Sequence, residues 1–292
     1  MSVLLLLLYT TSTNCYRYLP HSEERFSYVN ARNKHPVKIT DVPHQALVVY
    51  DNEYCSGSLI FSRIVLTVAS CFVQADVDIK CSVKLGANTV TGVGQIIPVI
   101  EKKIHEYYKH EVPLNNDIAL LVLERNVVFG LNVRKVIIVE PEIIIRTGTT
   151  IDVTGWGGSN LPMKYVHRLL LSEMKIATDE ECEQKYGKLK THSNFCARYQ
   201  PERRLSDNGG SALYKDHDID LLVGMLSFGG SFTEEHECLA LFTNISYFHR
   251  WIIFNSQRLL MKHCIDENTM YSSYEYNDSE MDSYEYEVRQ YV

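Results

Sequence analysis

The sequence lacks the features that mark membrane-spanning and nucleic-acid-binding chains. A transmembrane helix needs about 20 consecutive apolar residues, and the apolar run at the start of the chain, residues 1–9, is much shorter. Basic residues are not in excess, since the net charge is −7, and no segment resembles a DNA- or RNA-binding motif. We therefore expect no membrane span and no nucleic-acid partner. No pattern indicates a metal site or a cofactor, and we expect neither.

The two ends of the chain differ in composition from its body. Residues 1–15 contain the apolar stretch of a secretory signal peptide, although no Lys or Arg precedes Arg17 as is usual in such signals, and residues 16–30 form an N-terminal segment after it. Residues 265–292 form an acidic, tyrosine-rich tail with eight acids and one base, which accounts for the whole net charge of −7. Few aliphatic side chains and much like charge predict that this tail is disordered.

The body of the chain shows the pattern of an all-β fold. Short runs rich in β-branched and aromatic residues recur between turn residues, as a sandwich or barrel requires; the runs are 46–50, 82–85, 96–100, 118–122 and 150–153. One helix is predicted, at about residues 246–262, where apolar side chains recur on one face. Eight cysteines behind a leader sequence favour an oxidising compartment.

Several motifs in a fixed order carry a specific resemblance. They are Asp41-Val42-Pro43-His44-Gln45, Cys55-Ser56-Gly57-Ser58-Leu59-Ile60 with Leu66-Thr67-Val68-Ala69-Ser70-Cys71, Asn116-Asp117-Ile118-Ala119-Leu120-Leu121, Thr154-Gly155-Trp156-Gly157, and Ser206-Asp207-Asn208-Gly209-Gly210. The chain resembles the trypsin-like serine proteases over residues 31–264. The resemblance implies two antiparallel β-barrels packed face to face, an active-site cleft between them and a C-terminal helix.

The positions that match the catalytic triad do not hold the triad residues. Ser70 stands at the position of the general-base histidine, Asp117 matches the orienting aspartate, and Asn208 stands at the position of the nucleophilic serine. Acyl transfer by this route needs a hydroxyl or thiol that an adjacent base deprotonates. The resemblance therefore predicts a homologue with no functional catalytic residue, in which Asp117 is a structural carboxylate bonded to Ser70 or to nearby backbone N–H groups.

Other parts of the family's site can be assigned by the same resemblance. Ser206 and Asn208 match the oxyanion-hole positions, while Glu202, Ser227 and Gly229 match the specificity pocket. Asp207 matches the aspartate that pairs with a freed N-terminal amine after activation, but residues 30–34 lack the activation-site pattern. His105, His110 and His217 are available histidines that we expect to lie outside the site.

The resemblance also implies two disulfides, Cys55–Cys71 and Cys182–Cys196. The pairing of the remaining cysteines is open, and some of them could be buried free thiols; they are Cys15, Cys81, Cys238 and Cys264.

Three functional hypotheses follow. The first is a secreted, extracellular, non-catalytic protease homologue that acts as a binding partner, cofactor or decoy for an extracellular protein such as an active protease or its substrate. The second is a residual or non-standard serine-type endopeptidase. The third is binding through the anionic tail, in which four tyrosines lie next to carboxylates, as tyrosine sulfation favours; these are Tyr274, Tyr276, Tyr284 and Tyr286.

Overall fold

The computed structural model describes residues 34–50, 53–72, 80–143, 145–156, 167–200, 207–217, 219–229 and 238–264. The expectations for the signal peptide (1–15), the N-terminal segment (16–30) and the tail (265–292) concern residues outside these ranges. In the described part no helix is long and apolar enough to cross a membrane.

Six strands of the first half of the chain form a closed antiparallel barrel, in the order β2-β3-β4-β7-β6-β5. Their bounds are β2 Gln45–Tyr50, β3 Glu53–Phe61, β4 Ile64–Thr67, β5 Cys81–Leu85, β6 Gln95–Ile104 and β7 Ala119–Leu123. Val48 pairs with Cys55 on one side and Val83 on the other. All three side chains are buried, so this register fills the barrel interior with apolar side chains.

A second barrel follows in the chain. Strands β9 to β14 close in the order β9-β10-β11-β14-β13-β12, because β12 pairs with β9 and β9 with β10. A short β1 adds to β10, and β8 runs parallel to β13. The bounds are β1 Lys34–Pro36, β8 Ile137–Ile138, β9 Thr150–Gly155, β10 Leu170–Ile176, β11 Asn194–Arg198, β12 Ser211–Asp216, β13 Ile219–Phe228 and β14 Leu239–Asn244.

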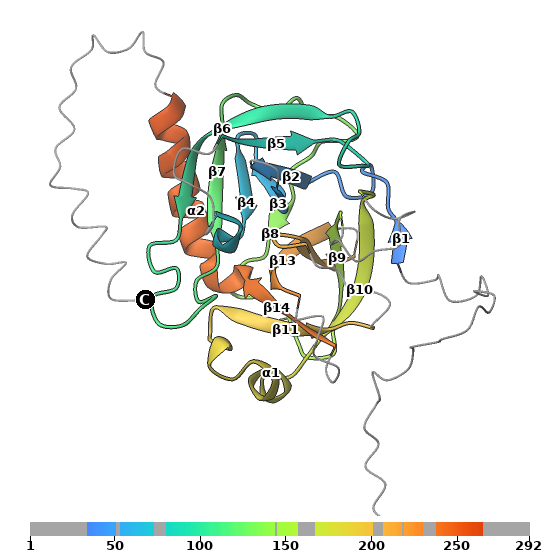
Figure 1. Cartoon of the computed structure of the whole chain (residues 1–292), viewed down its shortest axis with the longest axis vertical. Coiled ribbons are helices and arrows are strands. Elements are labelled where there is room, and N and C mark those ends of the chain that lie inside the picture. Colours follow the sequence, from blue (N-terminus) through green and yellow to red (C-terminus); the bar gives the residue numbers. More distant parts are fainter. Residues whose placement is uncertain are drawn as a thin grey trace, which may run out of the picture.

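The two barrels lie next to each other with α2 along their outer side (Figure 1). Helix α2 spans Ile245–Cys264 and buries Phe248, Ile252 and Leu259 on one face. This is the helix expected at about residues 246–262. The all-β prediction of two antiparallel barrels with a C-terminal helix is confirmed.

A second helix was not predicted. Helix α1 spans Asp179–Tyr186, with the 3-10 turn η2 at Gly187–Leu189 after it and another, η1, at Ala69–Phe72. Thr178 caps α1 because its hydroxyl accepts from Glu181 N, while the Glu181 carboxylate accepts from Thr178 N. Of its eight residues only Cys182 and Tyr186 are buried, so no apolar face marks the helix in the sequence.

Candidate functional site

Side chains from both barrels meet at Asp117. Asp117 precedes β7, Ser70 lies in η1 after β4, and Ser227 lies near the end of β13. Ser70 donates from its backbone N to Asp117 Oδ1 at 2.7 Å and from its Oγ to Oδ2 at 2.9 Å. Ser227 Oγ donates to the same Oδ2 at 2.5 Å. The structure thus places two of the three triad-matching residues and one pocket-matching residue in direct contact.

The Asp117 carboxylate is buried and already well supplied with donors. The residue is 1% exposed, and burial raises its carboxyl pKa, while bonds from Ser227 and Ser70 oppose that rise because they favour the charged form. Both carboxylate oxygens accept hydrogen bonds, and Ser70 directs its hydroxyl proton to Asp117. The side chain that the first barrel presents to Asp117 is thus the Ser70 hydroxyl, which acts as a hydrogen-bond donor.

Asn208 lies in a tight segment, 207–210, that leads into β12. Ser56 N of the first barrel donates to Asn208 O at 2.8 Å, and Gly209 N donates to Leu226 O of the second barrel at 2.7 Å. Gly209 has a φ of +83°, and an added Cβ would lie 2.0 Å from Ser56 O. Only glycine fits there, so backbone contacts with both barrels define the position of this segment.

Asp207 is bound by groups from both barrels. It is 3% exposed, and its Oδ2 accepts from Ser56 Oγ at 2.9 Å and from Trp156 N at 2.5 Å. A Cβ on Gly155 would lie 2.6 Å from that oxygen, so the carboxylate is closely packed as well as hydrogen-bonded. A hydroxyl and a backbone amide therefore bind the carboxylate that the resemblance assigns to an N-terminal ammonium.

Buried polar side chains continue this network across the contact between the barrels. Gln45 Nε2 donates to Ser56 Oγ at 3.0 Å, and Gln45 Oε1 accepts from Thr154 Oγ1 and Ser211 Oγ, each at 2.7 Å. His44 Nε2 lies 3.1 Å from Ser211 Oγ. Gln45 belongs to β2, whereas Thr154 and Ser211 belong to β9 and β12. The network thus joins the first barrel to the second.

His44 is neutral in this setting. Burial lowers its pKa to about 4, because a charged imidazole loses its hydration there.

The buried polar network around Gln45 and Asp207 was not predicted from the sequence. Ser56 could have pointed to it, since the residue stands where the family's Cys-Gly-Gly motif has a glycine, which carries no hydroxyl to donate to Asp207.

The segment that matches the specificity pocket, residues 227–229, contacts two tyrosines. Tyr199 OH donates to Gly229 O at 3.4 Å, and the Tyr186 ring packs edge-on against Phe228 at 6.3 Å between centroids. Of the other sequence-predicted site residues, Glu202 and Ser206 lie outside the described residues, as do the four tail tyrosines.

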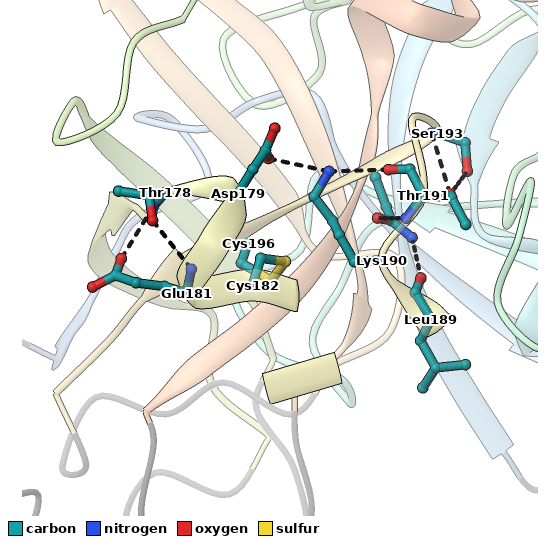
Figure 2. A network of polar contacts seen from close by, with 10 residues as sticks. Thr178, Asp179, Glu181, Cys182, Leu189, Lys190, Thr191, Ser193 and Cys196 are labelled. Atoms are coloured by element: carbon teal, nitrogen blue, oxygen red, sulfur yellow. Dashed lines mark hydrogen bonds and ion pairs between the residues drawn. A yellow bond between two sulfur atoms is a disulfide. The ribbon is translucent and has the colours of Figure 1, made fainter. Parts of the chain in front are cut away.

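A second polar network fixes the loop after α1 and ties it to the segment that carries Asp117. Lys190 Nζ binds the Asp179 carboxylate at 3.1 Å and donates to Thr191 O (Figure 2). Thr191 Oγ1 and Ser193 Oγ both donate to Asn115 Oδ1, at 3.2 and 3.0 Å. Because Asn115 is two residues before Asp117, this loop supports one side of the candidate site.

None of the three histidines considered from the sequence has a hydrogen bond to Asp117 or Asn208 among the described residues. His105 packs against Phe248 and Trp251 of α2, with ring centroids 5.3 and 5.0 Å away. The described residues also contain no group of three or more His, Cys, Asp or Glu side chains that could hold a metal ion.

The cysteines show how the scaffold is braced. Cys55 is bonded to Cys71 and Cys182 to Cys196, the two pairs that the resemblance implied. Cys238 also takes part in a disulfide. Cys81 is a buried free thiol, and burial raises its pKa to about 11.

Comparison with known proteins assigns the family. Residues 31–252 match the Trypsin family. The chain belongs to the trypsin family. Among trypsin-family relatives, it is 29% identical to "Trypsin 5G1" of Aedes aegypti over 66% of this chain and 73% of that protein. It is 28% identical to "Trypsin epsilon" of Drosophila erecta over 80% of this chain and 88% of that protein. It is also 28% identical to "Transmembrane protease serine 11B" of Homo sapiens, over 68% of this chain and 49% of that protein.

Proposed function

We propose that this trypsin-family protein is secreted and non-catalytic, and that it binds an extracellular protein through the protease scaffold. The observation that carries the proposal is the Ser70–Asp117 pair. In a working triad the aspartate orients an imidazole, which takes the proton of the nucleophile. Here the partner of Asp117 is a hydroxyl that donates to it, and a serine hydroxyl is too weak a base to activate a nucleophile.

The residue at the nucleophile position supports the same conclusion. Asn208 carries an amide, which has no hydroxyl or thiol to form an acyl intermediate. Ser70 is not a substitute, because among the described residues its hydroxyl contacts no imidazole and donates to the Asp117 carboxylate. Ser227 is 2% exposed and also donates to Asp117, so a substrate cannot reach its oxygen.

A partner can still recognise the scaffold. The structure contains the two barrels of the family, and binding sites on a fold can persist when its chemistry is lost. The loop held by Asn115 and segment 227–229 are the surfaces that we propose for this binding. Suitable partners are an active protease, for which this chain acts as a cofactor, or a protease substrate, which it shields as a decoy. The disulfides support an extracellular location.

Residual serine-type endopeptidase activity is the second candidate, because the curated relatives are named trypsins and a protease. Backbone hydrogen bonds from Ser56 N to Asn208 O and from Gly209 N to Leu226 O also support it, because they hold part of the segment that matches the oxyanion hole. An active chain must then use a nucleophile other than Asn208.

Labelling separates the two candidates. The purified full chain is treated with a serine-directed organophosphonate and assayed on a panel of fluorogenic peptides, with an active trypsin in parallel. We expect no labelling and no turnover. Stoichiometric labelling, or turnover that Asp117→Asn abolishes, contradicts the non-catalytic proposal. Asp117→Asn keeps the size of the side chain but sets an amide NH2 against the donors of Ser70 or Ser227. Circular dichroism and urea unfolding therefore check that a loss of turnover is not a loss of folding.

Binding through the anionic tail is a third candidate, supported by the concentration of the net charge in residues 266–292. Charge steering is screened over about 8 Å at physiological salt. Partner association measured at low and high salt should therefore slow strongly with salt in the intact chain. Mass spectrometry of the secreted protein should find sulfate on at least one of the four tail tyrosines. An unmodified tail and salt-independent association contradict this candidate.

A further inference from the structure

Helix α2 carries an exposed ridge on the side opposite its buried face. Tyr247, Phe254 and Met261 are 52%, 51% and 65% exposed, and Arg250 and Arg258 are exposed between them. Successive members of this set are three or four residues apart, so they line one face of the helix. We call these five residues the outer ridge of α2.

The outer ridge exposes side chains that are suited to binding another chain segment. Three large exposed apolar side chains alternate with two arginines along this stripe, a mixture that suits a chain segment with both rings and carboxylates. Neither Arg250 nor Arg258 forms an ion pair or a hydrogen bond with any residue in the described ranges. Lys262, one turn from Arg258, is by contrast bound to Glu101 at 2.8 Å.

The end of α2 is itself anchored beside the ridge. His263 Nε2 lies 2.5 Å from Glu101 Oε2, and Arg63 Nη1 donates to His263 O at 3.1 Å. Lys262 joins the same carboxylate. The last turn of α2 is therefore bound to the first barrel at one end of the outer ridge, and residue 265 follows directly in the chain.

The chain that follows is complementary to the ridge. Residues 266–292 carry eight acids, one base and six tyrosines, which supply carboxylates for the two arginines and rings for the apolar side chains. From Met261 to Tyr247 the ridge is about 21 Å long at 1.5 Å per residue. An extended segment covers that length in about seven residues, so the tail can reach it easily.

We propose that the acidic segment, residues 266–292, docks on the outer ridge of α2 of its own chain. Its carboxylates pair with Arg250 and Arg258, and its tyrosine rings cover Phe254 and Met261. The tether raises the local concentration of the segment to the millimolar range, so even weak contacts suffice. Docking limits the access of other proteins to the outer ridge and to the acidic segment. The proposal depends on the charges and exposure of the ridge, and it stands whether or not the chain is catalytic.

Oxidation of Met261 in the full chain tests the proposal. Mild peroxide converts an accessible methionine to its sulfoxide, and peptide mass spectrometry measures the rate at each site. The test variant is Arg250→Glu with Arg258→Glu, which repels the acidic segment. The matched control, Arg134→Glu with Lys135→Glu, makes the same charge change at two exposed residues outside α2. Buried Met174 and Met225 provide internal references for folding.

At low salt we expect Met261 to oxidise about fivefold or more faster in the ridge variant than in wild type and in the control. High salt should bring wild type to the rate of the ridge variant, because it screens the ion pairs. A glutamate-specific protease should likewise cleave the tail faster in the ridge variant. Equal Met261 rates in all three proteins at low salt overturn the proposal. Protection that rises with protein concentration, together with a dimer in sedimentation, also overturns it and assigns the ridge to a second copy.

Discussion

Replacing His44 with glutamine should remove a pH-dependent loss of stability. His44 is 3% exposed, and burial lowers its pKa from 6.5 to about 4. Between these two pH values the unfolded chain protonates this imidazole while the folded chain does not. The unfolded state then binds more protons, so the free energy of unfolding falls as the pH is lowered through this range.

The size of the effect follows from the two pKa values. A difference of one pKa unit corresponds to about 1.4 kcal/mol, so the fall from 6.5 to about 4 corresponds to about 3 kcal/mol of stability. Glutamine does not titrate, and its amide can replace the ring nitrogen beside Ser211 Oγ. The variant should therefore lack this dependence, although it can lose a constant amount of packing at every pH.

Urea unfolding at about pH 7.5 and about pH 4.5 measures the effect. Wild type should lose about 2–3 kcal/mol more than His44→Gln between the two conditions, and the difference between the proteins cancels other titrating groups. His217→Gln is the control, because the His217 side chain is 92% exposed. If the two proteins differ by the same free energy at both pH values, His44 is not held neutral by burial and the reasoning fails.

Three further predictions concern buried positions of the fold. Gly209→Ala should lower the free energy of unfolding by more than about 3 kcal/mol or prevent folding, because the added Cβ meets Ser56 O. The control is Gly130→Ala, which should change the free energy of unfolding in urea little, because nothing lies within 4 Å of the added Cβ. Ser227→Ala removes a donor from buried Asp117 and should cost about 1.5–3 kcal/mol near neutral pH. Because burial raises the Asp117 pKa, the carboxyl becomes neutral in acid and the loss of unfolding free energy in Ser227→Ala should then be smaller. An equal loss at neutral and acidic pH would count against the assigned hydrogen bond. Cys81 should resist alkylation in the folded protein and react only on unfolding, as its burial and raised pKa require; rapid labelling of the native chain contradicts this.

Much of the fold follows from local features of the sequence. Each predicted strand run lies in or beside an observed strand, because alternating β-branched residues and turns are local signals. The predicted helix became α2 because its apolar face repeats over several turns. Helix α1 was missed since it is short and polar, and its stability comes from the Thr178 cap and the Cys182–Cys196 bond.

The sequence alone identified Ser70, Asp117 and Asn208 as the residues that match the triad positions. The order of the motifs along the chain was enough to assign the chain to one family. Only the tertiary structure decided how they interact. Ser70 and Asp117 are 47 positions apart, and Ser56 and Asp207 are 151 apart. Bonds over such separations depend on how two barrels pack, and a local pattern does not encode that packing. For the same reason the outer ridge of α2 became visible only when the exposed side of the helix was known.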